Sequence, residues 1–547
     1  MSENEEDLPR EQSDSTKKKK KKKKKEKQSA KKKKKNGEKD EEEKCKEEEE
    51  EEVKEEEKNS EGVLLRGIFK VGKKSHDVLL TRTRLTWIPI IPENPTGETS
   101  VPQPGVLLLQ DVYAVKVKRR RAAGQQSGGA VLGVALFCCK RRGKRLEGDT
   151  LHLHNASTEH THIWYNTLKE LITGPSTRPR YLKVFINPCS HKKDAVHIYR
   201  EHVAPLFKMA DVRTDITVMK ECKLDGYDGV VCVGGDGSVA ELCHALVFRA
   251  QLDAGSPEKP VTAVLPLGII PAGSTDVVSC SVHGVRDPVT AALHIVLGHL
   301  QQVDMCSFSS LGQLVHFGFS AMFGFGGQCL ARAEKKRWMS STRRREYALV
   351  KTLARLRPED CQLSFLPAKK TNRDKDSGSV DAEVEESWTT NQGLYLSISI
   401  MSVPCLSPHT PRGLAPNTSL ANGSAALIAV GNTSRSEFIK HLKRYGSSSG
   451  QVNFERYNMF DSNRDFWAHV ARISNVPVVS LDLAILQAPL TDEDPPSLAE
   501  ASAFTLNIDG ELVEIANEVL IRVHPRLITL YGEEVDEAES TVSCSCI

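Results

Sequence analysis

Residues 228–250 read DGVVCVGGDGSVAELCHALVFRA, and this stretch sets the fold around it. Its first part is an apolar run that predicts a buried strand, and its last part has the amphipathic spacing of a helix. The two are joined by the turn Gly234-Gly235-Asp236-Gly237-Ser238. A strand, glycine turn and helix in this order aim free backbone N–H groups and the positive end of the helix at phosphate, and glycine leaves room for it. An ordinary strand-to-helix turn is the alternative that this stretch alone leaves open.

Residues 261–278, which read VTAVLPLGIIPAGSTDVV, form a second apolar stretch that ends in a turn of small residues. Gly273, Ser274 and Thr275 offer open backbone and two hydroxyls, which suit the second side of a nucleotide pocket. Asp236 would then lie where the first strand ends, able to accept a proton or to approach Mg²⁺.

The surrounding segments predict an α/β domain over residues 178–305. We interpret YLKVFINP (181–188) as a buried strand, AVHIYREHVAPLF (195–207) as a helix and DITVM (215–219) as a short strand. About eight residues, KECKLDGY, separate that short strand from the next one. Neighbouring parallel strands need a crossover of roughly a dozen residues or more. If the two strands are neighbours, a helix is missing here and the chain is a splice form or lacks a deleted segment.

The composition excludes both a small disulfide-dependent module and a wholly disordered chain. The chain has 547 residues, 75 Lys and Arg against 72 Asp and Glu, and is 39% apolar, which allows two or three domains. Residues 1–60 hold 21 basic and 21 acidic residues in blocks, so we expect a disordered tail. Its lysines would act as a nuclear address or touch nucleic acid; alternatively, its acidic half neutralises its basic half.

The chain shows no sign of a membrane span or of export. No uncharged apolar run reaches 18 residues, and the start MSENEEDLPR lacks the apolar core of a signal peptide. Its 14 cysteines therefore favour reduced thiols and a cytoplasmic location, with peripheral membrane association and nuclear entry as further expectations. Cys544 and Cys546, in the tail 533–547, outline a prenylation box that the preceding acidic residues disfavour.

Residues 62–173 predict several short strands closed by one helix, HTHIWYNTLKELITG (160–174). This order resembles a pleckstrin-homology domain, in which a Trp of the final helix packs into a β-barrel, and Trp164 is placed for that role. Two basic runs, at residues 116–121 and 140–145, would meet anionic lipid headgroups at the barrel mouth. Solvated loop charge is the alternative.

Together the two glycine turns resemble the diacylglycerol-kinase catalytic domain, which sphingosine and ceramide kinases share. GIIPAGSTD, AEKKRW and the closing DGE resemble the ceramide kinase branch. Within that branch, RGIF, NPCSHKK, FGFSAMFGFGG, HLKRY and HPRLITLYG are similar to the ceramide kinase-like group. The resemblance spans most of the chain from Gly62 to Gly532, and it implies ATP- and Mg²⁺-dependent phosphorylation of a hydroxyl on a sphingolipid or related lipid.

The resemblance also implies a site and a second domain, a β-sandwich lipid-acceptor domain over residues 306–532 with inserts near 368–391 and 446–464. Asp236 would polarise the lipid hydroxyl. Asp509 and Glu511, in NIDGELVEI, would share one face of a strand and hold Mg²⁺, unless Asp509-Gly510 is a hairpin turn. The residues expected to contact the nucleotide are Gly234, Gly235, Gly237, Ser238, Gly273, Ser274, Thr275, Arg337, Arg344 and Glu511.

Besides the short crossover at residues 220–227, two departures from the family's sequence pattern count against catalysis. The family resembles NPxGGxG after the first strand, whereas residues 187–193 read NPCSHKK and carry side chains where open backbone would meet phosphate. Lys192 or Lys193 would have to replace that contact. Gln328 stands where sphingosine and ceramide kinases carry an Asp, and an amide cannot take a proton. A membrane-recruited lipid or nucleotide sensor without catalysis is therefore the main alternative, and a nucleic-acid-associated protein led by its tail is a third.

Overall fold

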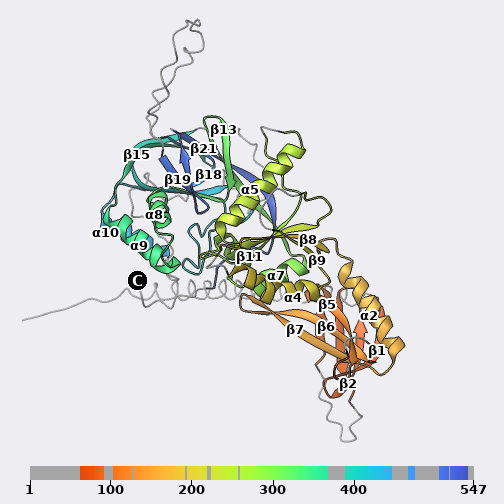
Figure 1. The fold of residues 1–547 in the computed structure, drawn as a ribbon. Coiled ribbons are helices and arrows are strands. Elements are labelled where there is room, and N and C mark those ends of the chain that lie inside the picture. The colour runs from red at the N-terminus through yellow and green to blue at the C-terminus, as the bar shows by residue number, and fades with distance from the viewer. Residues whose placement is uncertain are drawn as a thin grey trace, which may run out of the picture. The chain divides into compact units, whose positions relative to one another are not determined.

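The computed structural model describes residues 62–91, 103–125, 128–190, 194–217, 223–256, 259–367, 388–445, 466–474, 504–516 and 518–539 (Figure 1). The predictions for the tail 1–60, for Lys192 and Lys193, for most of the first insert and all of the second, and for the terminal cysteines lie outside these residues. None of the helices in the described stretches is long and apolar enough to cross a membrane.

The chain divides into two compact units, and the first contains residues 62–69 and 74–108 among those described. This unit holds short strands in the order β4-β3-β2-β1. Their bounds are Leu65–Val71 for β1, Lys74–Leu80 for β2, Arg84–Pro89 for β3 and Gly105–Leu108 for β4. In β2 every second residue from His76 is buried, as expected for a strand with one face against a core.

The second unit, which contains residues 70–73 and everything from Leu109, begins with three antiparallel strands and a helix. The bounds are Leu109–Asp111 for η1, Val112–Arg120 for β5, Ala130–Arg142 for β6, Arg145–His154 for β7 and Thr158–Thr173 for α2. The Ser157 hydroxyl caps α2 by accepting the His160 N–H at 3.2 Å. Helix α2 packs on β5 and β6, and Trp164 is buried on it. Strands followed by a helix match the predicted order, while the pleckstrin-homology assignment stays a prediction.

A parallel sheet with the order β11-β10-β8-β9 forms the middle of this unit. The strands are Tyr181–Ile186 (β8), Arg213–Thr217 (β9), Gly229–Gly234 (β10) and Leu267–Pro271 (β11). The helices are Ala195–Ile198 (α3), the π-helical turn Tyr199–Val203 (η3), Ala204–Met209 (α4), Asp236–Asp253 (α5), Val277–His283 (α6) and Pro288–Leu297 (α7). Strand β10 is buried along its whole length because both faces of the sheet are covered, with Leu242 of α5 in one core and Leu293 of α7 in the other.

Strands β9 and β10 are not neighbours. Both pair with β8, one on each side of it. A missing helix was expected only if these two strands were neighbours, so that expectation does not apply to β9 and β10. The connection must instead cross β8, and its residues 218–222 lie outside the described part of the chain.

The remainder is built mainly from antiparallel strands. The strands are Leu300–Ser310 (β12), Gln313–Gly318 (β13), Ser320–Gly324 (β14), Glu359–Pro367 (β15), Thr389–Met401 (β16), Ala425–Gly431 (β17), Phe466–Ser474 (β18), Phe504–Ile508 (β19), Glu511–Ile515 (β20) and Glu518–Tyr531 (β21). The helices are Phe325–Glu334 (α8), Ser341–Ala354 (α9) and Arg435–Tyr445 (α10).

The last strand, β21, joins this antiparallel part to the parallel sheet. It runs antiparallel to β12 and β18, and its end lies parallel to β11, where Leu530 pairs with Leu267. The expected domain boundary between residues 305 and 306 falls inside β12, which pairs with β21 on both sides of that point. The two expected domains therefore share one pair of strands, and their division stays a prediction.

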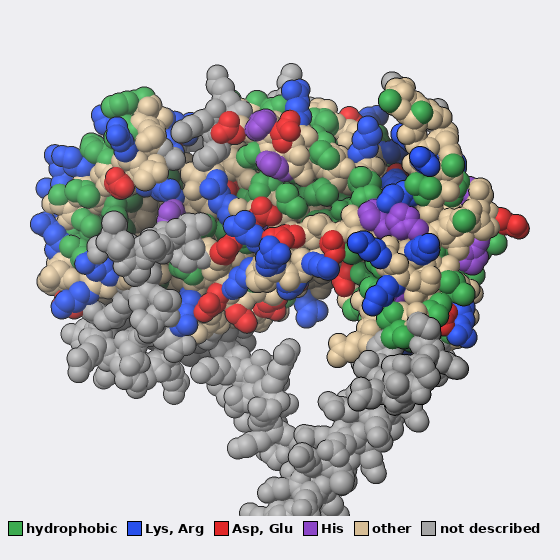
Figure 2. All heavy atoms as spheres, turned by 90° about the horizontal axis from the view of Figure 1, so that it is seen from below, with side chains coloured by type: hydrophobic (Ala, Val, Ile, Leu, Met, Phe, Trp, Pro, Cys, Tyr) green, Lys and Arg blue, Asp and Glu red, His purple; other side chains and the backbone are tan. Residues whose placement is uncertain are grey.

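The basic run at residues 140–145 is paired within the chain. The ion pairs are Lys140–Asp149 at 2.5 Å, Arg141–Glu533 at 2.6 Å, Arg142–Glu147 at 3.4 Å and Arg145–Glu539 at 3.0 Å. Lys144 donates to the carbonyl oxygen of Glu537. Figure 2 shows similar mixing on one face of the molecule, where Lys and Arg lie among Asp and Glu. This pairing reduces the positive charge that the run can offer to a lipid surface.

The substitution Gly298→Ala is expected to destabilise the protein more than Gly255→Ala. Both glycines follow helices and have positive φ values, 73° and 60°. A β-carbon on Gly298 would lie 2.5 Å from the Thr177 carbonyl oxygen, whereas one on Gly255 would meet nothing within 4 Å. We expect losses of about 1 kcal/mol at Gly255 and about 3 kcal/mol at Gly298, because only the latter forces the backbone apart. Urea unfolding measures both, and equal losses would contradict this steric account.

Candidate functional site

The two glycine turns are in direct backbone contact. They follow β10 and β11, which are neighbouring parallel strands. The Ala272 N–H donates to the Gly234 carbonyl oxygen at 3.0 Å, and a β-carbon on Gly273 would lie 2.5 Å from the Gly235 Cα. Gly273 therefore cannot be replaced without separating the turns. The carboxyl ends of strands are also the edge at which open α/β sheets bind ligands.

Asp236 begins α5, and its carboxylate contacts the second turn. Its Oδ2 accepts the N–H of Asp276 at 3.0 Å, and its Oδ1 accepts that of Val278 at 3.4 Å. Burial and the neighbouring Asp276 carboxylate raise the pKa of Asp236 to about 7, with a further contribution from Asp509. A carboxyl group that titrates near neutral pH is suited to take a proton from a hydroxyl.

Asp276 and Arg286, which the sequence analysis does not single out, hold the second turn in shape. Asp276 has a φ of 58° and is 2% exposed. Its carboxylate accepts the Gly273 N–H at 2.8 Å and Arg286 Nε at 2.5 Å. Arg286 also donates to the Gly273 carbonyl oxygen. The sequence signal for Asp276 was its place in PAGSTD, but nothing nearby pointed to Arg286, which is ten residues further along the chain.

Arg345 is the arginine that contacts the second turn from α9. It donates to the Ser274 carbonyl oxygen at 3.4 Å and to Thr275 Oγ1 at 3.3 Å. The predicted Arg344 is its neighbour in the first turn of α9, while the predicted Arg337 is 76% exposed and pairs with a glutamate three residues before it. Composition cannot distinguish the members of the run 343–345, and the expected contacts of Arg337 and Arg344 with the nucleotide stay predictions.

The expectation that Asp509 and Glu511 lie on one strand is wrong. The segment forms a hairpin in which Ile508 of β19 pairs with Glu511 of β20. Asp509 and Gly510 are the two turn residues, with φ values of 47° and 91°. Two positive φ values in a two-residue loop match the twist of the flanking strands, and Asp-Gly is a preferred sequence for it.

Asp509 is held by Phe319 and by Ser320, the first residue of β14. Its carboxylate accepts the N–H groups of Phe319 and Ser320, each at 2.7 Å, and the Ser320 hydroxyl at 2.8 Å. Burial nevertheless raises the pKa of Asp509 to about 6. A carboxylate has about four acceptor positions, so these three donors leave little capacity for a metal ion.

Glu511 lies against the start of α5. A β-carbon on Gly237 would be 3.3 Å from Glu511 Oε1, so this carboxylate reaches the first glycine turn. Burial, with the charges of Glu241 and Asp509, raises the pKa of Glu511. Within the described stretches no three His, Cys, Asp or Glu side chains gather as a metal site. One or two carboxylates suffice where substrate phosphates complete the coordination, and the residues present fit Mg²⁺ in that manner, Glu511 better than Asp509.

The first loop touches the same site through Asn187. Its Nδ2 donates to the Oγ of the buried Ser238 at 2.7 Å, and its Oδ1 accepts the Cys189 N–H at 3.0 Å. The loop therefore begins beside the first glycine turn. Residues 191–193, with both predicted lysines, lie outside the described residues.

Gln328 lies on α8 and is bonded to other side chains. Its Nε2 donates to Glu359 Oε1 at 2.5 Å, and its Oε1 accepts Arg332 Nη1 at 3.4 Å. Both ends of the amide are thus engaged within the antiparallel part of the chain.

Comparison with known proteins identifies the family. Residues 181–308 match the model of the diacylglycerol kinase catalytic domain, and residues 319–547 match that of the ceramide kinase C-terminal domain. A ceramide kinase-like protein from Homo sapiens is 44% identical over 525 residues, which cover 87% of this chain and 92% of that protein. This chain belongs to the ceramide kinase-like family. The resemblance inferred from the glycine turns is thereby confirmed.

Other members of the wider family are more distant. Ceramide kinase from Homo sapiens is 31% identical over 430 residues, which cover 69% of this chain and 78% of that protein. Among solved structures, a putative diacylglycerol kinase from Bacillus anthracis aligns with a TM-score of 0.42 at 15% identity, over 65% of this chain and 96% of that one.

The substitution Asp509→Asn is expected to lower the free energy of unfolding by about 2 kcal/mol, because an amide offers one acceptor oxygen to three donors. Asp253→Asn is the matched control, since that carboxylate is 63% exposed and forms an ion pair with Arg249 on the helix surface. We expect the control to cost about 0.5 kcal/mol. Guanidinium unfolding measures the stability of both variants. If the Asp509 variant is as stable as the control, the three hydrogen bonds of Asp509 contribute little to the free energy of unfolding.

Proposed function

We propose that this chain is a lipid kinase that transfers the terminal phosphoryl group of ATP, with Mg²⁺, to a hydroxyl of a sphingolipid or related lipid. Family membership supports a lipid kinase. The observation that carries the proposal is the position of Asp236, a carboxyl group with a pKa near 7 at the junction of two glycine turns. Such a junction suits a triphosphate, and such a carboxyl suits the proton of an attacking alcohol.

In the proposed step the backbone N–H groups of both turns bind the phosphates, and Arg345 offsets their charge from the side of Thr275. The lipid hydroxyl oxygen attacks the terminal phosphorus, and the bond from that phosphorus to the bridging oxygen breaks to release ADP. The hydroxyl proton passes to the Asp236 carboxylate. Arg286 and Asp276 keep the second turn in the conformation that binds phosphate.

Glu511, assisted by Asp509, would hold Mg²⁺ on the phosphates. The ion supplies positive charge that lowers the repulsion among the phosphate oxygens. Glu511 is placed for this because it reaches the start of α5, where the phosphates would lie.

A second candidate is a sensor that binds nucleotide or lipid and does not turn it over. Two observations favour it: the amide of Gln328 is bonded at both ends, and Ser190 and His191 stand where the family pattern has two glycines. Its recruitment to membranes would use the residues 62–173. Titration with Mg²⁺ and ATP followed by a screen of labelled lipids separates the two, because a sensor binds without forming a phosphorylated lipid.

The substitution Asp236→Asn is expected to abolish phosphorylation of lipid while ATP affinity changes less than about threefold, because the amide cannot accept the proton. The folded-state pKa of Asp236 lies above its usual 3.8. The stability that this group contributes is therefore full below pH 3.8 and is lost as the pH rises through 7. The melting temperature of the variant relative to the native chain should thus increase from pH 5 to pH 8.

Two measurements check this prediction: radiolabelled ATP turnover and thermal unfolding at the two pH values. Asp253→Asn serves as the control: it should retain turnover and lower the melting temperature by the same small amount at both pH values. Unchanged turnover in the Asp236 variant would reject the catalytic assignment, and a pH-independent difference in melting temperature would reject the raised pKa.

Replacing Arg345 should weaken ATP binding more than replacing Arg337 does. Arg345 touches the second turn, whereas Arg337 is exposed and paired outside it. We expect Arg345→Gln to raise the dissociation constant of Mg²⁺ and ATP about tenfold, and Arg337→Gln to change it less than twofold. Calorimetric titration of both variants tests this, and the reverse order would favour Arg337, one of the two arginines selected from the sequence.

A further inference from the structure

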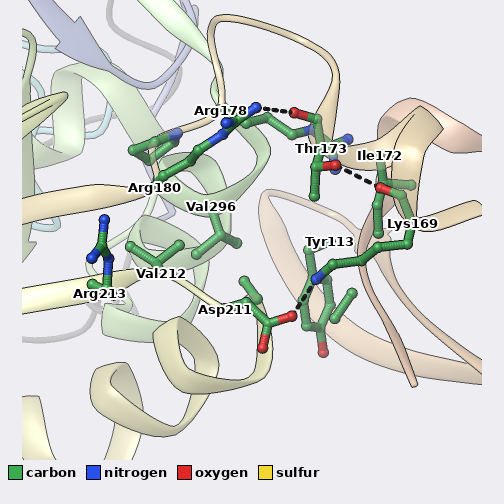
Figure 3. A pocket seen from close by; sticks show the side chains of 13 residues that line it. Tyr113, Lys169, Ile172, Thr173, Arg178, Arg180, Asp211, Val212, Arg213 and Val296 are labelled. Atoms are coloured by element: carbon green, nitrogen blue, oxygen red, sulfur yellow. Dashed lines mark hydrogen bonds and ion pairs between the residues drawn. The ribbon is translucent and has the colours of Figure 1, made fainter. Parts of the chain in front are cut away.

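A pocket lies at the end of the parallel sheet opposite to the glycine turns, and Figure 3 shows the side chains that line it. Its volume is about 370 Å³. Arg180 immediately precedes β8 and Arg213 begins β9, so both lie at the amino ends of strands whose carboxyl ends face the other edge. Strand β8 has six residues, which span about 20 Å. No residue of the candidate site lines this pocket.

Three arginines line the pocket without a carboxylate partner among the described residues. Arg178 donates to three backbone carbonyl oxygens in and just after η1, at 2.6–3.2 Å. Arg180 donates to the Thr173 carbonyl oxygen at 3.0 Å, which places its side chain along one edge of the pocket (Figure 3). The Arg213 guanidinium lies 5.1 Å from the centre of the Tyr181 ring. Carbonyl oxygens and ring faces do not neutralise a full positive charge.

The one acidic residue of the lining is already paired with two lysines. The Asp211 carboxylate lies 2.5 Å from Lys116 Nζ and also pairs with Lys169, which extends from α2 on the other side of the pocket (Figure 3). The lining thus has four cationic side chains, those of Lys169, Arg178, Arg180 and Arg213, and one carboxylate, which also pairs with Lys116 outside the lining. The pocket therefore has an excess of positive charge that a bound anion would balance.

The inner wall of the pocket is apolar. Ile172, Val212 and Val296 line it, and each is at most 8% exposed. An inorganic anion alone would leave this wall against water, whereas an apolar group attached to the anion would cover it.

We propose that this pocket binds a small organic molecule that carries a phosphate group on an apolar body. Guanidinium groups match phosphate because their N–H donors can engage two of its oxygens at once. Arg180 and Arg213 bind the phosphate at the rim, and the apolar body rests on Val212 and Val296. This site is independent of the proposed kinase function, because it uses none of the residues at the glycine turns.

Calorimetric titration of the full chain with octyl phosphate, octanol and inorganic phosphate tests the proposal. We expect octyl phosphate to bind at least tenfold more tightly than either of the others, because only it supplies both the charge and the apolar body. Equal affinity for octyl phosphate and octanol, or for octyl phosphate and inorganic phosphate, would overturn the proposal.

Substitutions then locate the site. Arg180→Gln and Arg213→Gln change exposed side chains, so both variants should fold, which thermal unfolding checks. Each is expected to weaken octyl phosphate binding at least fivefold, whereas Arg249→Gln, an exposed arginine on α5, leaves it unchanged. Binding that survives both pocket variants but is lost in Arg345→Gln would place the ligand at the glycine turns and overturn the proposal.

A final arm distinguishes a soluble phosphate ester from a lipid headgroup. Vesicles of phosphatidylcholine with phosphatidic acid are added during the octyl phosphate titration. Competition by these vesicles but not by pure phosphatidylcholine assigns the pocket to a lipid, and unchanged binding assigns it to a soluble ester. Both results agree with a ligand that carries a phosphate group on an apolar body. If the vesicles compete at this pocket, Arg180→Gln and Arg213→Gln must abolish that competition.

Discussion

The contact between the two glycine turns is the constraint on which the rest of the site depends. Because the β-carbon that Gly273 lacks would lie 2.5 Å from the Gly235 Cα, the ends of β10 and β11 can approach only with bare backbone between them. This approach brings the Asp276 N–H within 3.0 Å of the Asp236 carboxylate. A wider separation would leave that carboxylate without its donor, and the proposed base would lose both its position and its environment.

The same closeness puts carboxylates together at a cost in stability. Burial and Asp276 raise the pKa of Asp236, and Asp509 adds to the effect. Arg286 offsets part of this charge by pairing with Asp276 at 2.5 Å. Negative charge gathered in this way is unfavourable when the site is empty. It is offset when the phosphates bind together with a divalent cation, beside the arginines of the site.

The sequence predicts the local elements of this fold well because their signals are contiguous. The passage from β10 through the turn into α5 is visible in one stretch, since an apolar run, glycines and an amphipathic run follow one another directly. The wrong or missing predictions are of two kinds. Some residues come together from distant positions in the chain, and others lie in a segment that suits both a strand and a turn. Asp509 was expected on a strand with Glu511, because two residues separated by one position share a face of a strand. The Asp-Gly pair instead adopts two positive φ values and forms a hairpin turn. Arg286 could not be predicted, because its role depends on how α6 returns to the turn. The pairing of β21 with β11 likewise joins segments more than 250 residues apart.

Charge pairing inside the chain also limits where a membrane could be recognised. Two cations of the run at 140–145, Arg141 and Arg145, pair with Glu533 and Glu539. That C-terminal segment also binds the end of α6, because the Glu533 N–H donates to the Val282 carbonyl oxygen and the Glu539 N–H to that of Gly284. These cations therefore help to hold the helix that follows the second glycine turn. A charge that is paired in this way attracts an external anion less, because the partner's field opposes it. Among the described residues, Lys118 to Arg121 form no such ion pair, so this shorter run keeps more of its charge for an external anion than the run at 140–145 does.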